Sequence, residues 1–171
     1  MLGFLNKKKR EYEKGYKPYT EKKYSDAIPH LEYSANKGYD KAQILLGDYY
    51  DKNLDLDEDS SKTVAWYKKA AKQGNAEAQY KLAVKYSMSW DILGLCLYHN
   101  QQTVEDIECD CCLVEVFSSI DKGSSIKKSY NRQEMEIAYD KLEAIVKNLL
   151  TLAMKQGHKE AKEEYDKYFN Q

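Results

Sequence analysis

Apolar residues recur every three or four positions along most of the chain, which is the pattern of amphipathic helices. Two segments carry the same apolar face, formed by Ala42, Leu46 and Tyr50 within residues 40–51 and by Ala78, Leu82 and Tyr86 within residues 76–87. The chain contains only eight Gly and two Pro, so few positions oppose helix formation. The pattern therefore predicts an all-α protein.

Each of these apolar faces begins at the same number of residues after a glycine. Gly38 and Gly74 lie 36 residues apart, and each has an alanine three residues before it and another four residues after it. A third copy surrounds Gly157, with alanines four residues before and four residues after it. Self-similarity at this period indicates a helical repeat array, and glycine tolerates the left-handed backbone of a tight turn. We expect antiparallel helices to be joined at these three glycines.

Gly, Pro and capping residues predict the helix boundaries. A charged opening helix at about 5–14 should end before Gly15 and Pro18, and Pro29 should lie in or near the first turn of the next helix. Asn131 and Glu134 form a capping-box pattern at the start of a long helix. Beyond the opening helix, we expect helices at about 25–37, 40–51, 62–73, 76–87, 131–156 and 159–169.

The repeat fails between Met88 and Tyr130. In this part we expect a short apolar helix at 90–99, then either a helix over 103–120 or a strand over 111–117, and then a loop over 121–130. Gly74 and Gly157 lie 83 residues apart, which exceeds two repeats by 11 and leaves room for one degenerate repeat plus an insertion. The predicted organisation is a single domain, 1–171, with repeats at about 20–52, 53–88 and 131–171 and an irregular insert at 88–130.

The charge balance limits the classes of partner. The chain of 171 residues has 27 Lys and Arg against 28 Asp and Glu, a formal net charge of −1. Nucleic acids and anionic membranes select for an excess of positive charge, so neither is expected as a partner. No apolar run approaches the roughly 20 residues that span a bilayer. We expect a cytoplasmic protein that does not interact with membranes.

Several motifs resemble the Sel-one-like repeat, a relative of the tetratricopeptide repeat. They are KTVAWY at 62–67, KAA at 69–71, QGNAEAQ at 73–79, Leu46-Gly47 with Tyr50, and Asp59 at the start of a second helix. The similarity covers about residues 24–86 and, less closely, 149–169. It implies α/α hairpins stacked into a superhelix and a role as an adaptor or scaffold, commonly in bacterial interaction or signalling systems. The resemblance brings no catalytic residues with it.

The same resemblance implies a binding surface. In this family the ligand lies against the concave face, which is lined by outward positions of each first helix. Those positions correspond here to Ile44, Asp48, Asp51, Tyr80, Val84 and Ser87. We expect the tyrosine and aliphatic side chains to act as apolar anchors and the two aspartates to select charge. The alternative is that residues of the insert cover this face and make it part of the core.

The cysteines are the one chemical anomaly. Cys109, Cys111 and Cys112 cluster in the sequence, with Cys96 and His99 upstream. Thiolates and an imidazole can hold zinc, but the spacing C-x-C-C lacks the paired C-x₂-C knuckles of structural zinc sites. Reduced, partly buried thiols are therefore expected, and a metal or redox site built on these four cysteines stays as an alternative.

No arrangement typical of an enzyme occurs, such as a Ser/His/Asp order, a phosphate-binding glycine loop or a metalloprotease signature. We therefore expect a non-enzymatic module without a cofactor that binds a protein or peptide partner through its concave face. It would act as an adaptor or as a small inhibitory protein, such as the immunity partner of a toxin. The alternative function is a cysteine-based metal or redox sensor.

Overall fold

The computed structural model describes residues 2–52, 58–98, 103–105 and 129–170, and in these ranges the chain is predominantly helical. The elements in chain order are α1 (Leu2–Thr20), α2 (Tyr24–Asn36), α3 (Asp40–Lys52), α4 (Glu58–Lys72), α5 (Ala76–Tyr98), β1 (Thr103–Glu105), β2 (Ser129–Asn131), α7 (Arg132–Lys155) and α8 (Lys159–Phe169). The all-α prediction is therefore confirmed for the described residues, apart from one short two-stranded ladder.

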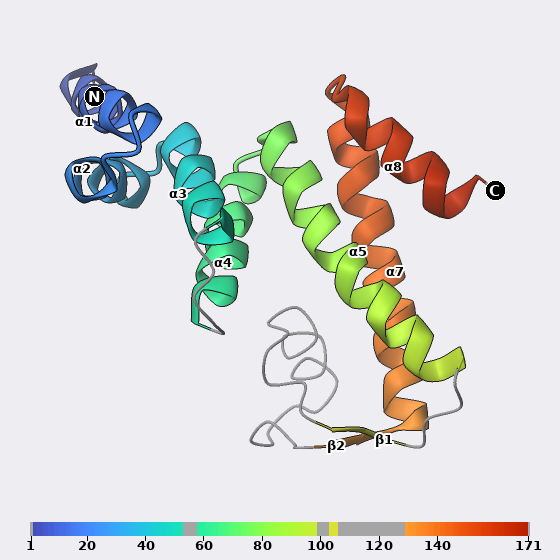
Figure 1. The fold of residues 1–171 in the computed structure, drawn as a ribbon. Helices are drawn as coiled ribbons and strands as arrows, with labels where there is room; N and C mark the ends of the chain where they lie inside the picture. The colour runs from blue at the N-terminus through green and yellow to red at the C-terminus, as the bar shows by residue number, and fades with distance from the viewer. Residues whose placement is uncertain (1, 53–57, 99–102, 106–128, 171) are drawn as a thin grey trace.

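The helices pack as successive antiparallel neighbours (Figure 1). The most extensive contacts join α1 with α2, α3 with α4, and α5 with α7, while α2 with α3, α4 with α5 and α7 with α8 make smaller contacts. The chain termini lie at opposite ends of an elongated molecule. We use the term first helices for α1, α3, α5 and α8, and second helices for α2, α4 and α7.

The three predicted turn glycines join a second helix to the next first helix. Gly38, Gly74 and Gly157 have φ of 75°, 86° and 82°, a region that glycine enters without steric cost. In each turn the glycine N–H donates to the carbonyl three residues earlier, and the following N–H donates to the carbonyl five residues earlier. These two bonds define the Schellman motif. The predicted turns are thus confirmed, with the same hydrogen bonds each time.

Glutamine side chains reinforce two of these junctions in the same way. Gln73 Nε2 donates to Gln43 Oε1 at 2.7 Å, and Gln156 Nε2 donates to Gln79 Oε1 at 2.8 Å. Gln43 and Gln79 each also donate to a backbone carbonyl of the preceding second helix. Because both acceptor glutamines are buried, satisfying their polar atoms within the junction avoids a desolvation penalty.

Helix α1 extends past the predicted stop at 14. Gly15 lies inside it and is buried, and a Cβ on this glycine would come within 2.9 Å of Leu31 Cγ and 3.0 Å of the Ala27 carbonyl oxygen of α2. The glycine therefore allows α2 to approach closely, and does not break the helix. Pro18 is tolerated because it lies in the last turn. The N-terminal helix pair α1/α2 consequently begins before residue 20, where the first repeat was expected to start.

Pro29 lies near the first turn of its helix, as expected. Helix α2 begins at Tyr24, so this proline lies in the second turn. The pyrrolidine ring removes one backbone donor there, yet the helix continues to Asn36 because Ala27, Leu31 and Ala35 anchor it in the core.

Helix α5 likewise continues beyond its predicted end. It runs for 23 residues to Tyr98, so Met88, the expected start of the irregular insert, lies within a regular helix. The short helix expected at 90–99 is the second half of α5. Trp90 and Leu93 in this half are buried against α7, and this long-range packing maintains the helix where the repeat motif stops.

The remainder of the expected insert is only partly described. Residues Thr103–Glu105 pair antiparallel with Ser129–Asn131, at the far end of α5 and α7 (Figure 1). The helix expected over 103–120 is wrong at its start, because Thr103–Glu105 form a strand, and the loop expected over 121–130 ends earlier, because Ser129 and Tyr130 belong to β2. The rest of that helix, the alternative strand over 111–117, most of the loop and most of the degenerate repeat were expected in residues that lie outside the described ranges. The capping box is confirmed, since the Asn131 side chain accepts from the Glu134 N–H and the Glu134 carboxylate accepts from the Asn131 N–H, both at 3.0 Å.

Among the described residues, two groups of buried side chains form the core. One joins α1, α2 and α3 around Leu31 and Leu46, and the other joins α4, α5, α7 and α8 around Tyr67, Leu93 and Leu142. None of the described helices has the length and apolar character needed to cross a membrane.

Candidate functional site

Equivalent positions on the first helices can be aligned through their contacts with the second helices. A Cβ on Gly47 would lie 2.3 Å from Tyr67 Cε1, as a Cβ on Gly15 would lie against Leu31. Tyr67 and Leu31 each precede their turn glycine by seven residues. Gly15 of α1 and Gly47 of α3 are therefore structural equivalents, and Ala83 takes this position in α5, nine residues after Gly74 as Gly47 is nine after Gly38.

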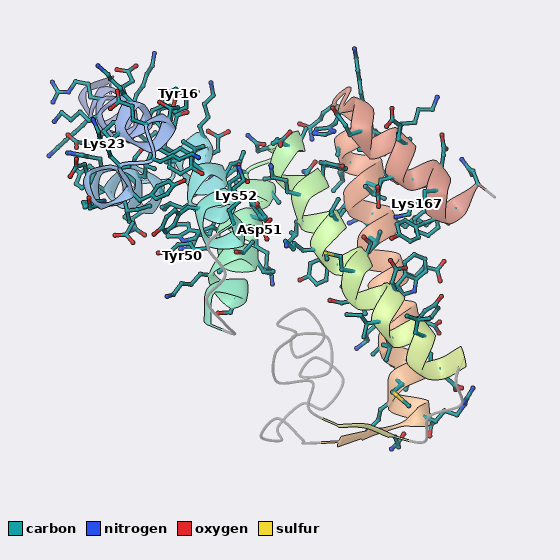
Figure 2. The ribbon with its side chains drawn as sticks, viewed as in Figure 1. Tyr16, Lys23, Tyr50, Asp51, Lys52 and Lys167 are labelled. Atoms are coloured by element: carbon teal, nitrogen blue, oxygen red, sulfur yellow. The ribbon has the colours of Figure 1, made fainter. Side chains whose placement is uncertain are left out.

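This alignment defines a surface that we call the first-helix face. In α8 the aligned position is Asp166, nine residues after Gly157. The face comprises the residues three before, one after and four after each aligned position. These are Tyr12, Tyr16 and Tyr19 on α1, Ile44, Asp48 and Asp51 on α3, Tyr80, Val84 and Ser87 on α5, Glu163 and Lys167 on α8, and Asn170 directly after α8. The six residues expected from the sequence occupy its two central rows. Figure 2 labels one member on each of three helices, Tyr16, Asp51 and Lys167.

The α1 row of the first-helix face consists of tyrosines that sequence reasoning missed. Tyr12 contacts Tyr16 with 5.5 Å between ring centroids, and Tyr16 is 47% exposed. Burial, with smaller contributions from neighbouring tyrosines and Asp40, raises the pKa of Tyr12 to about 12. Burial, followed by the charge of Asp48, raises the pKa of Tyr19 to about 12. Both hydroxyls therefore stay protonated and able to donate at neutral pH. Recognising Gly15 as the equivalent of Gly47 would have revealed this row.

The two aspartates of the face are paired within the molecule. Asp48 Oδ1 accepts from the Tyr67 hydroxyl at 2.7 Å and lies 3.1 Å from Lys81 Nζ, while Asp51 forms an ion pair with Lys85. Both pairs join α3 to α5. Since each carboxylate already has a cationic partner, we infer that the aspartates position neighbouring first helices, which differs from the charge-selecting role expected from the sequence.

Burial and charge explain the titration behaviour of this part of the face. Burial raises the pKa of Tyr67, and its hydrogen bond to Asp48 adds to the shift. Burial lowers the pKa of Lys81, but the carboxylates of Asp48 and Glu77 outweigh that effect, so the pKa is raised overall. The lysine is therefore charged throughout the physiological range and holds two carboxylates together.

A further set of contacts connects α5 to α8. Glu77 Oε1 lies 3.3 Å from Lys81 Nζ, and Glu77 Oε2 lies 2.9 Å from His158 Nε2. The His158 ring stacks on Tyr80 with 4.6 Å between centroids. Tyr80 is thus held between α5 and the start of α8. The polar contacts form an unbroken line across three first helices, from Asp48 through Lys81 and Glu77 to His158.

The remaining predicted residues differ in exposure. Ile44 and Val84 are partly exposed, as anchors for a partner should be. Ser87 is buried, and its hydroxyl donates to the Val84 carbonyl at 3.0 Å. We therefore do not assign Ser87 a contact with a partner.

Beyond Ser87 the face is hollowed between α5 and α8. This cavity of about 610 Å³, which we call the aromatic pocket, is lined by Trp90, Asp91, Gly94, Leu95, Tyr139, Lys167, Tyr168 and Phe169. It lies outside the residues that the sequence suggested as a site. The one relevant signal was the concentration of aromatic residues at 165–169 opposite Trp90, which only the fold brings together.

The described part of the chain contains no group of three or more His, Cys, Asp or Glu side chains arranged to hold a metal ion. The zinc or redox alternative depended on Cys96, Cys109, Cys111 and Cys112. The last three lie outside the described residues, and the side chain of Cys96 is also undescribed. That alternative is therefore untested.

No protein-family model, curated protein or solved structure matches the chain.

Proposed function

We propose that this chain is a non-enzymatic α/α repeat protein of the Sel-one-like type, and that its first-helix face binds a protein partner. The proposal includes a superhelical stacking in which first helices line the inner surface. The observation that carries it is the continuity of this face, in which α3, α5 and the start of α8 connect through the contacts from Asp48 to His158.

The composition of the face supports a protein partner. Tyrosine is enriched at protein interfaces because its ring supplies apolar contact area and its hydroxyl a hydrogen bond. Tyr12, Tyr16, Tyr19 and Tyr80 occupy four of its positions, and Ile44 and Val84 add partly exposed aliphatic surface between them. The internal ion pairs prevent the central carboxylates from repelling an apolar partner, since a paired charge costs less to cover than an isolated one.

The proposal can be tested by photo-crosslinking from defined positions. A benzophenone amino acid at Tyr16 or Val84 should crosslink one protein in cells of the source organism, whereas the same group at Asn148, which is exposed on the second helix α7, should not. The crosslinked protein is then purified, and its complex with the chain is measured by calorimetry. Tyr16→Ala should weaken this complex at least tenfold, and Asn148→Ala should leave it unchanged.

Equal crosslinking from Asn148, or a purified candidate that does not bind, would refute the proposal. If the partner is an enzyme, the same complex distinguishes the two forms of the proposal. A one-to-one complex that abolishes the enzyme's activity indicates an inhibitory or immunity-type protein, while retained activity indicates an adaptor.

A further inference from the structure

The aromatic pocket continues the first-helix face along the extension of α5. Asp91 follows Ser87 by four residues and Val84 by seven, the spacing of neighbours on one helix surface. Lys167, the α8 member of the face, lines the opposite wall. The pocket is therefore the part of the same surface where α5 and α8 leave a cavity.

The walls of the aromatic pocket are mostly rings. The Trp90 ring stacks on Phe169 with 5.6 Å between centroids and tilts against Tyr139 and Tyr168 at 5.4 Å and 5.2 Å. Aromatic rings favour a further ring in an offset or edge-to-face position, beyond the gain from area alone. A volume of about 610 Å³ falls within the range of ligand pockets, and it accommodates an aromatic side chain with its adjoining backbone.

Three polar side chains of the pocket are paired with one another, and one buried donor is not. The Tyr168 hydroxyl donates to Asp91 Oδ2 at 2.8 Å and accepts from Lys167 Nζ at 3.1 Å. Trp90 is 8% exposed, and its buried Nε1–H donates no hydrogen bond of acceptable geometry to any described residue. Burial raises the pKa of Tyr139, and a contact of hydrogen-bond type with Trp90 lowers it in part, but this contact does not reach hydrogen-bond geometry. A buried N–H in this state favours an incoming acceptor.

The charges around the rings argue against a cationic occupant. Lys167 Nζ lies 4.4 Å from the centroid of Tyr168, and Lys147 Nζ lies 5.2 Å from that of Phe169. Two of the ring faces that would attract a cation thus already have one. The occupant that matches the pocket is neutral and planar, with an oxygen acceptor beside it.

Exposed apolar residues next to the pocket indicate that this occupant belongs to a protein. Leu95, which lines the pocket, is 60% exposed, and Ile92 and Met88 are 49% and 54% exposed on the preceding turns of α5. Contiguous exposed apolar side chains of this kind mark interaction surfaces. A free small molecule in the pocket would leave them in water, whereas a polypeptide could cover them.

We propose that the aromatic pocket receives an aromatic side chain of the protein partner, and that a backbone carbonyl of that partner accepts the Trp90 N–H. This inference rests on the proposed function, because it assigns a specific anchor to the partner of the first-helix face.

The test uses the two tryptophans of the chain, Trp66 and Trp90, as probe and internal control. Their indole N–H signals are recorded by ¹⁵N–¹H NMR on the full chain, and Trp66→Phe assigns them. N-acetyl-phenylalaninamide, which carries one aromatic ring and two carbonyls, should shift the Trp90 signal saturably with a dissociation constant on the order of 1 mM, as expected for so small a ligand. The Trp66 signal should stay in place, and N-acetyl-glycinamide should shift neither.

Two variants with similar exposure locate the binding. Leu95→Glu places a charge at the pocket and should weaken the titration at least fivefold, while Ile92→Glu, which is on the same helix but does not line the pocket, should leave it unchanged. An immobile Trp90 signal, equal shifts of both tryptophans, or equal effects of the two variants would overturn the inference. The NMR titration tests only the aromatic pocket, and crosslinking from Tyr16 and Val84 tests the first-helix face. A negative titration together with positive crosslinking would therefore reject the pocket proposal and leave the proposed function standing.

Discussion

The pairs α3/α4 and α5/α7 both end in the same glycine turn, yet they differ in length. Helix α3 has 13 residues and α4 has 15, whereas α5 has 23 and α7 has 24. The two helices of the long pair are therefore extended by nearly equal amounts, and the extensions pack against each other through Trp90 and Tyr139. The comparison teaches that one helix pair can be lengthened while its turn geometry is preserved, and that the added length lines a pocket.

The two pairs also differ in the side chains that allow their helices to pack closely. In α3/α4 the absence of a side chain at Gly47 makes room for Tyr67, whose hydroxyl reaches Asp48. In the long pair the equivalent positions hold Ala83 and Leu150, which belong to the same core cluster. A larger residue on the first helix is thus matched by a smaller one on the second. Close approach through glycine reappears further along α5, where Gly94 faces Tyr139.

Placing at Gly47 the alanine that the long pair has at the equivalent position should have the largest effect on stability. Gly47→Ala would place a Cβ 2.3 Å from Tyr67 Cε1, so the tightly packed ring must move. We expect a loss of about 3 kcal/mol in the free energy of unfolding, because overpacking outweighs the gain of about 1 kcal/mol in helix propensity. Urea denaturation monitored by circular dichroism measures the loss.

Two matched variants test the cause. In a Tyr67→Leu background, which copies the long pair, Gly47→Ala should cost less than about 0.5 kcal/mol, since the added methyl group then has space. Gly94→Ala should cost less than about 1 kcal/mol, because its Cβ would lie 3.1 Å from the edge of Tyr139, which lines the pocket. Equal losses for Gly47→Ala with and without Tyr67 would show that ring contact is not the reason.

The shared turn provides a second test. Gly74 has φ of 86° and no atom within 4 Å of an added Cβ, so Gly74→Val meets backbone strain alone. A β-branched residue in this region should cost about 2 kcal/mol, and Gly74→Asn should cost clearly less because asparagine tolerates left-handed backbone. The melting temperature of each variant gives the order. Equal losses for valine and asparagine would contradict strain as the cause.

Local signals in the sequence predicted the three glycine turns and the capping box of α7 correctly. A positive φ strongly favours glycine at that residue, and a capping box needs two side chains three positions apart, so Gly157, Asn131 and Glu134 carried sufficient information by themselves. Features that depend on distant partners were wrong or missed. Gly15 looks like a helix breaker until Leu31 is known to lie against it.

The end of α5 was predicted too early for a related reason. Its second half carries buried residues such as Leu93 on one side and exposed apolar residues such as Ile92 on the other, so the contrast that reveals an amphipathic helix is weak. The ion pairs that Asp48 and Asp51 form with lysines of α5 could not be predicted from local rules either. Their lysine partners lie 33 and 34 residues later, close to the repeat period, and opposite charges at that separation are the signal that could have predicted them.

The contacts between neighbouring first helices also differ from one junction to the next. This difference predicts a smaller change in stability that depends on pH. The residue after the turn glycine is Asn75 at one junction, where its amide donates to Asp40 at 2.6 Å, and His158 at the next, where its ring lies 2.9 Å from Glu77. Burial raises the pKa of Glu77, but His158 and Lys81 outweigh this and lower it below its usual value of 4.5.

A carboxyl group whose pKa is lowered by folding stabilises the protein above its unfolded pKa, and this contribution is lost as the pH falls. At pH 7, Glu77→Gln should therefore be less stable than the unmodified chain by less than about 1 kcal/mol, since the group is partly exposed and solvent screens it. The difference should shrink progressively as the pH falls below 4.5. In a His158→Asn background, which gives this junction an amide like that of Asn75, the difference at pH 7 should shrink. A difference that is independent of pH would mean that Glu77 acts through packing and not through its charge.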